Sequence, residues 1–181
     1  MNPPVAILIG LIVVIAAVID IRSRRIPNWL TLSGIIVGFA LNTLLAYPFP
    51  LEGLKNAGLG MLFAFVVYFV LYLIRAMGAG DVKLMAAVGA ILASPSVWFR
   101  FFIVVALVGG IFALALTLAK GRLRKTVWNV AFLVNELGHA RAPYMSRDEL
   151  DVKSSHAVTL PHGFTIAVSY FLFLALSLLV K

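Results

Sequence analysis

Residues 6–20 read AILIGLIVVIAAVID, an uninterrupted apolar run that ends in an aspartate. A membrane-spanning helix needs about 20 mostly apolar residues, and the stretch from Pro4 to Ile19 approaches that length. This stretch lacks the basic start and the small-x-small cleavage site of a secretory signal peptide. We therefore predict a retained membrane helix that carries the carboxylate of Asp20 at its end.

Similar apolar runs follow along the whole chain. Of its 181 residues, 62% are hydrophobic and only 12% are charged, an apolar share well above that of soluble domains. The predicted fold is all-α, a polytopic membrane protein with about six transmembrane helices in a single membrane-embedded domain over 1–181. The expected segments are about 4–20, 28–47, 54–75, 81–94, 96–119 and 161–180. The fourth is short, and we expect it to be tilted or shielded by its neighbours.

The basic residues predict how the chain is oriented. The net charge is +8, and the charges fall between apolar runs, where they indicate topology rather than nucleic-acid binding. Twelve of the fifteen Lys and Arg residues lie in the 21–27 turn, the 75–83 junction and the 120–160 loop. The positive-inside rule makes these connections cytoplasmic and turns both termini outward. In the inner membrane, Asp20 and Asp81 then both meet the cytoplasmic face. The 120–160 loop is either a solvated connector, which we favour, or holds a surface helix.

The residue inventory limits the chemistry. Cysteine is absent, which excludes disulfides, thiolate nucleophiles and cysteine-ligated zinc. The three histidines are widely scattered, so the sequence predicts no metal site and no cofactor. Five of the seven acidic residues lie in expected loops, where solvation explains them. Asp20 and Asp81 lie at helix ends at membrane depth, where a carboxylate is costly and therefore a functional candidate.

Each of these two aspartates also has a structural interpretation. Asp81 is a suitable N-cap for the fourth helix, and Asp20 could form an ion pair with a nearby arginine. The two together favour function, because both fall on one membrane face. Gly78 and Gly80 precede Asp81 and leave room for the close approach of an extended peptide. We predict that Asp20 and Asp81 are a catalytic pair.

Two motifs resemble those of a known family. The stretch Asp20-Ile-Arg-Ser-Arg-Arg-Ile-Pro-Asn28 resembles the first-aspartate motif of bacterial type IV prepilin peptidases. Gly78-Ala-Gly-Asp-Val-Lys-Leu84 resembles their G-x-G-D-x-K-L motif, and Leu160-Pro-His-Gly163 resembles a less specific element of the same family. The resemblance implies a membrane aspartyl endopeptidase that removes the basic leader of pilin precursors at the cytoplasmic face, using two aspartates and a water.

The size of the chain is most similar to the short, single-function peptidases of tight-adherence (Flp) pilus systems. Larger members of the family also N-methylate the new terminus and carry a domain with paired Cys-x-x-Cys motifs. This chain has neither the domain nor any cysteine, so we expect no methyltransferase activity. The expected partners are prepilin and pseudopilin precursors and the lipid bilayer, without nucleic acid. The oligomeric state stays open.

The remaining motif residues have supporting roles in this interpretation. Lys83 is either a positive-inside anchor or a contact for an acidic residue of the substrate. Pro27 and Asn28 form the turn that aims Asp20, with Asn28 as a cap for the second helix. The helix dipole favours an anion at the start of a helix, which makes Asp81 the expected ionised member of the pair.

Two other functions compete with prepilin processing. A presenilin-like intramembrane protease also uses a G-x-G-D acid, but its partner acid typically follows a tyrosine in mid-helix, whereas Ile19 precedes Asp20. A non-enzymatic, proton-coupled membrane carrier would explain the two acids but not the Arg-rich I-P-N turn. Cleavage of a pilin precursor by purified protein distinguishes an enzyme from a carrier.

Overall fold

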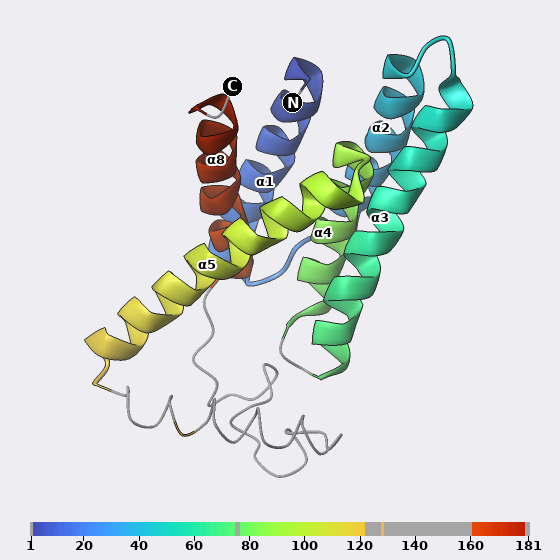
Figure 1. Cartoon of the computed structure of the whole chain (residues 1–181). Coiled ribbons are helices and arrows are strands. Elements are labelled where there is room, and N and C mark those ends of the chain that lie inside the picture. The colour runs from blue at the N-terminus through green and yellow to red at the C-terminus, as the bar shows by residue number, and fades with distance from the viewer. Residues whose placement is uncertain (1, 75–76, 122–127, 129–160, 180–181) are drawn as a thin grey trace.

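The computed structural model describes residues 2–74, 77–121, 128 and 161–179. Six helices account for nearly all of this part of the chain (Figure 1): α1 Pro3–Ser23, α2 Asn28–Leu45, α3 Pro50–Leu73, α4 Ala79–Leu92, α5 Pro95–Ala119 and α8 His162–Leu179. The all-α prediction is confirmed. All of these helices except α4 are long and apolar enough to cross a membrane. The chain is a multi-pass membrane protein.

The predicted segments match these helices closely, with two shifted starts. The third helix begins at Pro50 rather than near residue 54, since a proline at the first helical position and Glu52 in the first turn both favour a helix start there. The fourth helix begins at Ala79, two residues before the predicted start. The expected loop at 120–160 lies, apart from residues 120, 121 and 128, outside the described residues.

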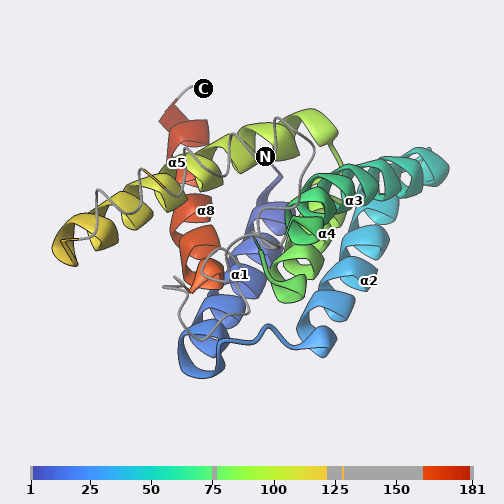
Figure 2. The same cartoon turned by 90° about the horizontal axis from the view of Figure 1, so that it is seen from below.

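The helices are arranged so that the two motif aspartates come to the same end of the molecule. Figure 1 shows the N-terminal end of α1 and the C-terminal end of α8 at the top. The C-terminal ends of α1, α3 and α5 point to the opposite end, and so do the N-terminal ends of α2, α4 and α8. Seen from below in Figure 2, α4 lies between α1, α2 and α3, while α5 crosses the bundle obliquely. The end opposite the termini therefore gathers every connection that carries a motif.

The short helix α4 is the centre of the bundle. Its residues from Leu84 to Ile91 are all buried, as is Val82. Asn42 of α2 donates from Nδ2 to the carbonyl oxygens of Ala90 and Ile91, at 3.1 and 3.0 Å, and so satisfies groups left open at the end of α4. Trp98 of α5 donates from Nε1 to the carbonyl oxygen of Met85 at 3.3 Å. The prediction that neighbours shield the fourth segment is confirmed.

Glycines let α3 approach α4 very closely. A Cβ on Gly60 would overlap the carbonyl oxygen of Gly89, and a Cβ on Gly89 would overlap the carbonyl oxygen of Gly60. Small residues of this kind permit backbone-to-backbone packing in membrane bundles, where the hydrophobic effect does not drive helices together. The pairing of α3 with α4 therefore depends on these two positions having no side chain.

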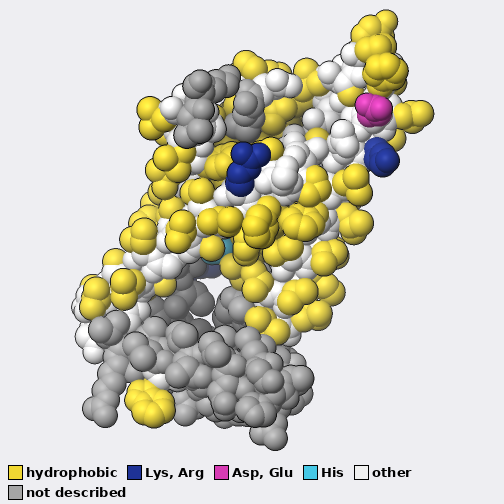
Figure 3. Space-filling view, viewed as in Figure 1, with side chains coloured by type: hydrophobic (Ala, Val, Ile, Leu, Met, Phe, Trp, Pro, Cys, Tyr) yellow, Lys and Arg dark blue, Asp and Glu magenta, His cyan; other side chains and the backbone are white. Residues whose placement is uncertain are grey.

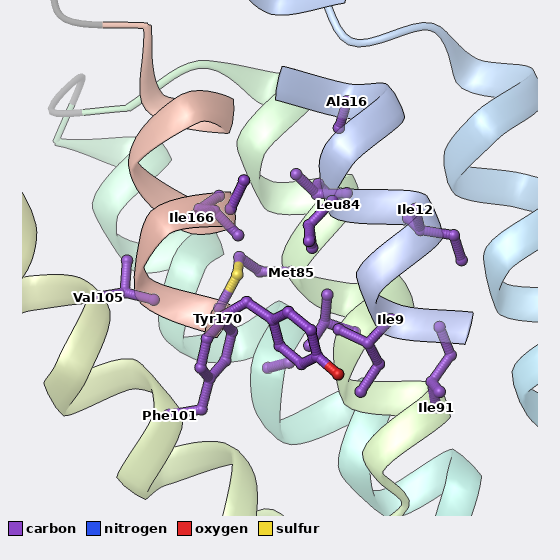
Figure 4. Close-up of a cluster of buried hydrophobic side chains, with 14 of the residues drawn as sticks. Ile9, Ile12, Ala16, Leu84, Met85, Ile91, Phe101, Val105, Ile166 and Tyr170 are labelled. Carbon is purple, nitrogen blue, oxygen red and sulfur yellow. The ribbon is translucent and has the colours of Figure 1, made fainter. Parts of the chain in front are cut away.

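The core and the surface are both apolar, as a lipid environment allows. Figure 4 shows core side chains from four helices pointing toward one another, among them Ile9 of α1, Leu84 of α4, Phe101 of α5 and Ile166 of α8. On the face that Figure 3 shows, hydrophobic side chains predominate, with few charged groups among them, and exposed large hydrophobic residues occur in every described helix except α4. The helices are thus apolar on nearly all sides, which is typical of transmembrane segments.

The close approach of α3 and α4 predicts a strong size limit at Gly60. Gly60→Ala should lower stability in detergent by about 1–3 kcal/mol, because the added methyl group must displace the backbone of α4. Thermal unfolding followed by size-exclusion chromatography measures this loss. Gly110→Ala is the matched control, since a Cβ there meets nothing within 4 Å and helix propensity favours alanine. Equal stability of the two variants would contradict the packing argument.

Candidate active site

Asp20 lies in the last turn of α1 and is almost fully buried, with 7% of its surface exposed. Its Oδ2 accepts a hydrogen bond from the backbone N–H of Gly163, at the start of α8, at 2.8 Å. A Cβ on Gly163 would stand 3.1 Å from both Cβ and Oδ2 of Asp20. The glycine therefore donates to the carboxylate and also leaves the space that the carboxylate needs.

Asp81 lies in the first turn of α4, three residues after Gly78, which caps the helix. The backbone N–H of Gly78 donates to Oδ2 of Asp81 at 3.3 Å. A Cβ on Gly78 would lie 3.3 Å from the same oxygen. Asp81 is thus not the N-cap that the structural interpretation required, but reaches back to the cap residue from the third helical position. Like Asp20, Asp81 accepts a hydrogen bond from the backbone N–H of a glycine, a residue without a side chain to crowd the carboxylate.

The two aspartates come together although they lie on different helices. The negative charge of Asp20 acts directly on Asp81, which itself is half-buried. Burial, and then the neighbouring Asp20 charge, raise the pKa of Asp81 above its ordinary value, while the Gly78 N–H lowers it by less. This direction opposes the expectation, drawn from the helix dipole, that Asp81 is the ionised member, because burial and the like charge raise its pKa by more than the Gly78 N–H lowers it.

The predicted supporting residues form a contact network around the turn between α1 and α2. Gly80 packs against this turn, and a Cβ on it would stand 3.2 Å from Cβ of Ile26. Lys83 donates from Nζ to Oδ1 of Asn28 at 2.9 Å, which ties α4 to the start of α2. The cap of α2 is Pro27 rather than Asn28, and no side chain bonds there. Lys83 therefore has a structural partner that neither sequence interpretation named.

Two further polar side chains lie beside the aspartates and were not predicted as site residues. Tyr68 of α3 is fully buried, and the Asp81 charge acts on it. His162 directly precedes Gly163, and its ring centroid lies 6.5 Å from that of Tyr68. The Pro-His-Gly motif was a signal for His162 in the sequence. Tyr68 had no such signal, because it stands in an aromatic-rich helix where packing alone would explain it.

The described residues contain no group of three or more His, Cys, Asp or Glu side chains that could hold a metal ion. The chemistry available at this site is that of two carboxyl groups within range of each other's charge, one of them with a raised pKa. Such a pair holds and activates a water in aspartic proteases.

Comparison with known proteins gives the family to which the chain belongs. A family model described as the type IV leader peptidase family matches residues 7–114, which is more than half of the chain and includes Asp20 and Asp81. The chain belongs to the type IV leader peptidase family. The match covers most of α1, all of α2 to α4 and most of α5, so this leader peptidase family member carries both aspartate motifs within the matched region. No curated protein and no solved structure matches the chain.

The raised pKa of Asp81 predicts that its charge destabilises the folded protein at neutral pH. When folding raises the pKa of a carboxyl group, the folded protein becomes less stable as the pH rises from the ordinary pKa of that group through its raised pKa. Asp81→Asn should therefore raise the Tm in detergent at neutral pH by a few degrees, since about 1 kcal/mol shifts Tm by roughly 2–4 °C at this size. The gain should shrink at mildly acidic pH, where wild-type Asp81 is already protonated.

Glu52→Gln is the control for this measurement. Glu52 is exposed in the first turn of α3, where its charge is favourable, so its loss should give no gain in Tm. A lower Tm for Asp81→Asn at neutral pH would show that the surroundings stabilise the ionised carboxylate, contrary to the direction given above.

Proposed function

We propose that this chain is an aspartic-type endopeptidase that removes the leader peptide of type IV, Flp-like prepilins by means of Asp20, Asp81 and one water. The observation that carries the proposal is the meeting of two acids, from the end of α1 and the start of α4, within range of each other's charge. Membership of a leader peptidase family supplies the reaction class. Neither capping nor an exposed ion pair would require two carboxylates at one buried place.

The mechanism follows from the different protonation of the two groups. In the proposed cycle Asp81, whose pKa is raised, begins as the proton donor, and Asp20, which accepts the Gly163 N–H, begins as the general base. Asp20 takes a proton from the water, whose oxygen attacks the scissile carbonyl carbon, while Asp81 gives its proton to the carbonyl oxygen. The resulting diol returns one proton to Asp81 as the C–N bond breaks, and Asp20 gives its proton to the leaving nitrogen.

The proposed substrate fits the end of the molecule where the aspartates lie. We place this end at the cytoplasmic face of the inner membrane, because the basic connections of the chain gather there. A pilin precursor has a basic leader in the cytoplasm followed by an apolar helix in the bilayer, so its cleavage site meets the membrane surface at the same depth. An acidic residue after the cleavage site remains a proposed partner for Lys83.

The two competing functions predict different results. A presenilin-like protease would cut within the apolar helix of its substrate, whereas a prepilin peptidase cuts before it. A proton-coupled carrier would leave the precursor intact. The mass of the product from purified enzyme and a pilin precursor separates all three outcomes.

Asp20→Asn and Asp81→Asn should each abolish precursor cleavage, with a loss of at least about a thousandfold in kcat. Each change keeps the shape of the side chain and removes the ionisable group. Because the two residues act as one unit, the double variant should be no worse than either single variant.

The intact mass of the product shows where the precursor was cut. In the presence of a methyl donor, it also shows whether the new N-terminus was methylated. We propose that the product is unmethylated, since the chain has no cysteine.

Glu52→Gln is again the control, because Glu52 lies in the first turn of α3, away from the aspartates, and should leave cleavage unchanged. Near wild-type cleavage by either Asp→Asn variant would refute the catalytic pair. A product heavier by one methyl group would refute the single-function proposal but leave the peptidase intact.

The proposed orientation is tested with single cysteines, because any introduced thiol is the only one in the chain. Ser23→Cys lies at the end of α1 beside the aspartate end, and Pro50→Cys lies at the start of α3. Both positions are exposed. In intact cells, an impermeant thiol reagent should label the cysteine at 50 and should label the one at 23 only after permeabilisation. The opposite pattern would invert the topology.

A further inference from the structure

Two buried polar atoms lack a hydrogen-bond partner among the residues that the structure describes. They are the hydroxyl oxygen of Tyr68 and Nε2 of His162. Nearly all buried polar atoms in proteins are hydrogen-bonded, and leaving one without a partner costs about 1–3 kcal/mol. These two atoms belong to rings that lie 6.5 Å apart, centroid to centroid, on helices far apart in the sequence. Such a concentration of unsatisfied groups points to a ligand that supplies their partners.

Both side chains lie in the same part of the molecule as the aspartates. Tyr68 lies within electrostatic range of the Asp81 carboxyl group, and His162 directly precedes Gly163, whose N–H donates to Asp20. The unsatisfied hydroxyl and imidazole thus lie beside the place where the water and the scissile peptide bond would react. The mechanism proposed above gives neither of them a role.

The Tyr68 ring is also held rigidly. Its ring centroid lies 6.0 Å from that of Trp98 and 5.9 Å from that of Phe102, with the ring planes nearly perpendicular in both pairs, and none of its surface is exposed. Because the ring is packed on these sides, the hydroxyl cannot swing away to find another partner. Enzymes stabilise charge that develops in a transition state with hydrogen-bond donors that are already held in position before the substrate binds. A rigid hydroxyl that has no hydrogen-bond partner in the free protein fits this description.

We propose that Tyr68 is a further catalytic residue whose hydroxyl donates a hydrogen bond to the oxygen of the scissile carbonyl, while His162 binds the substrate backbone beside it. This inference rests on the proposed peptidase function. Tyr68 keeps its proton throughout, so the proton transfers between the two aspartates and the water are unchanged. The substrate provides the partners that both groups lack in the free protein.

The test compares Tyr68→Phe with Tyr170→Phe in the cleavage assay and in thermal unfolding. Tyr170 is a matched buried tyrosine, but its hydroxyl donates to the carbonyl oxygen of Ala6, away from the aspartates. Tyr68→Phe should lower kcat and kcat/KM together by about 10- to 100-fold, because it removes a bond made chiefly in the transition state. Its Tm should stay the same or rise, because the variant removes an unsatisfied buried group.

Tyr170→Phe should show the opposite pattern, a lower Tm with unchanged kcat, because it removes a satisfied structural bond. For His162, glutamine can place an amide N–H near the position of Nε2, so His162→Gln should retain more activity than His162→Leu. A purely structural role for Tyr68 would lower Tm and activity together and would overturn the inference.

The failures of the two proposals are distinguishable. Wild-type cleavage by Tyr68→Phe, with the Asp→Asn variants inactive, overturns only the role of Tyr68. A wild-type protein that does not cleave the precursor overturns both proposals.

Discussion

The enclosure of α4 is the constraint on which the rest of the structure depends. This helix is only 14 residues long and is surrounded by its neighbours, so its ends must be satisfied and positioned by protein rather than by lipid or water. Three contacts hold α4 in place. The glycines of α3 and α4 pack backbone against backbone, the Asn42 amide binds carbonyl groups at the C-terminal end of α4, and the Trp98 indole binds a carbonyl group along its side. Because α4 is fixed at this depth, Asp81 at its start is fixed as well.

The two carboxylates are accommodated in the same way. Each accepts one N–H from a glycine, Gly163 for Asp20 and Gly78 for Asp81, and in each case a side chain on that glycine would crowd the carboxylate oxygen. A backbone N–H partly offsets the cost of burying a carboxylate. Unlike a lysine or arginine partner, it does not neutralise the negative charge. The charge of Asp20 is therefore still felt by Asp81 and helps to raise the pKa of Asp81.

The last helix contributes to the site as much as the motif helices do. Residues 20 and 163 are joined by a hydrogen bond, so α8 closes the bundle against α1 and brings His162 toward Tyr68 of α3. On the opposite side, the Lys83 to Asn28 bond and the packing of Gly80 on Ile26 hold the turn that follows Asp20. The site is thus assembled from four helices, and a shift in any of them would move a carboxylate or a donor.

The sequence by itself predicted the helices and indicated the two aspartates as candidates, because apolar runs long enough to span a bilayer and acids at membrane depth are local features of the chain. It also indicated that the fourth helix is shielded, from its length. It could not give the partners of these residues: Lys83 binds Asn28 and Gly163 donates to Asp20. Nor could it show that burial raises the pKa of Asp81, which opposes the effect expected from the helix dipole. Tyr68 was hidden among aromatic neighbours. These outcomes depend on which helix faces meet, and only the tertiary structure decides which side chains are buried together.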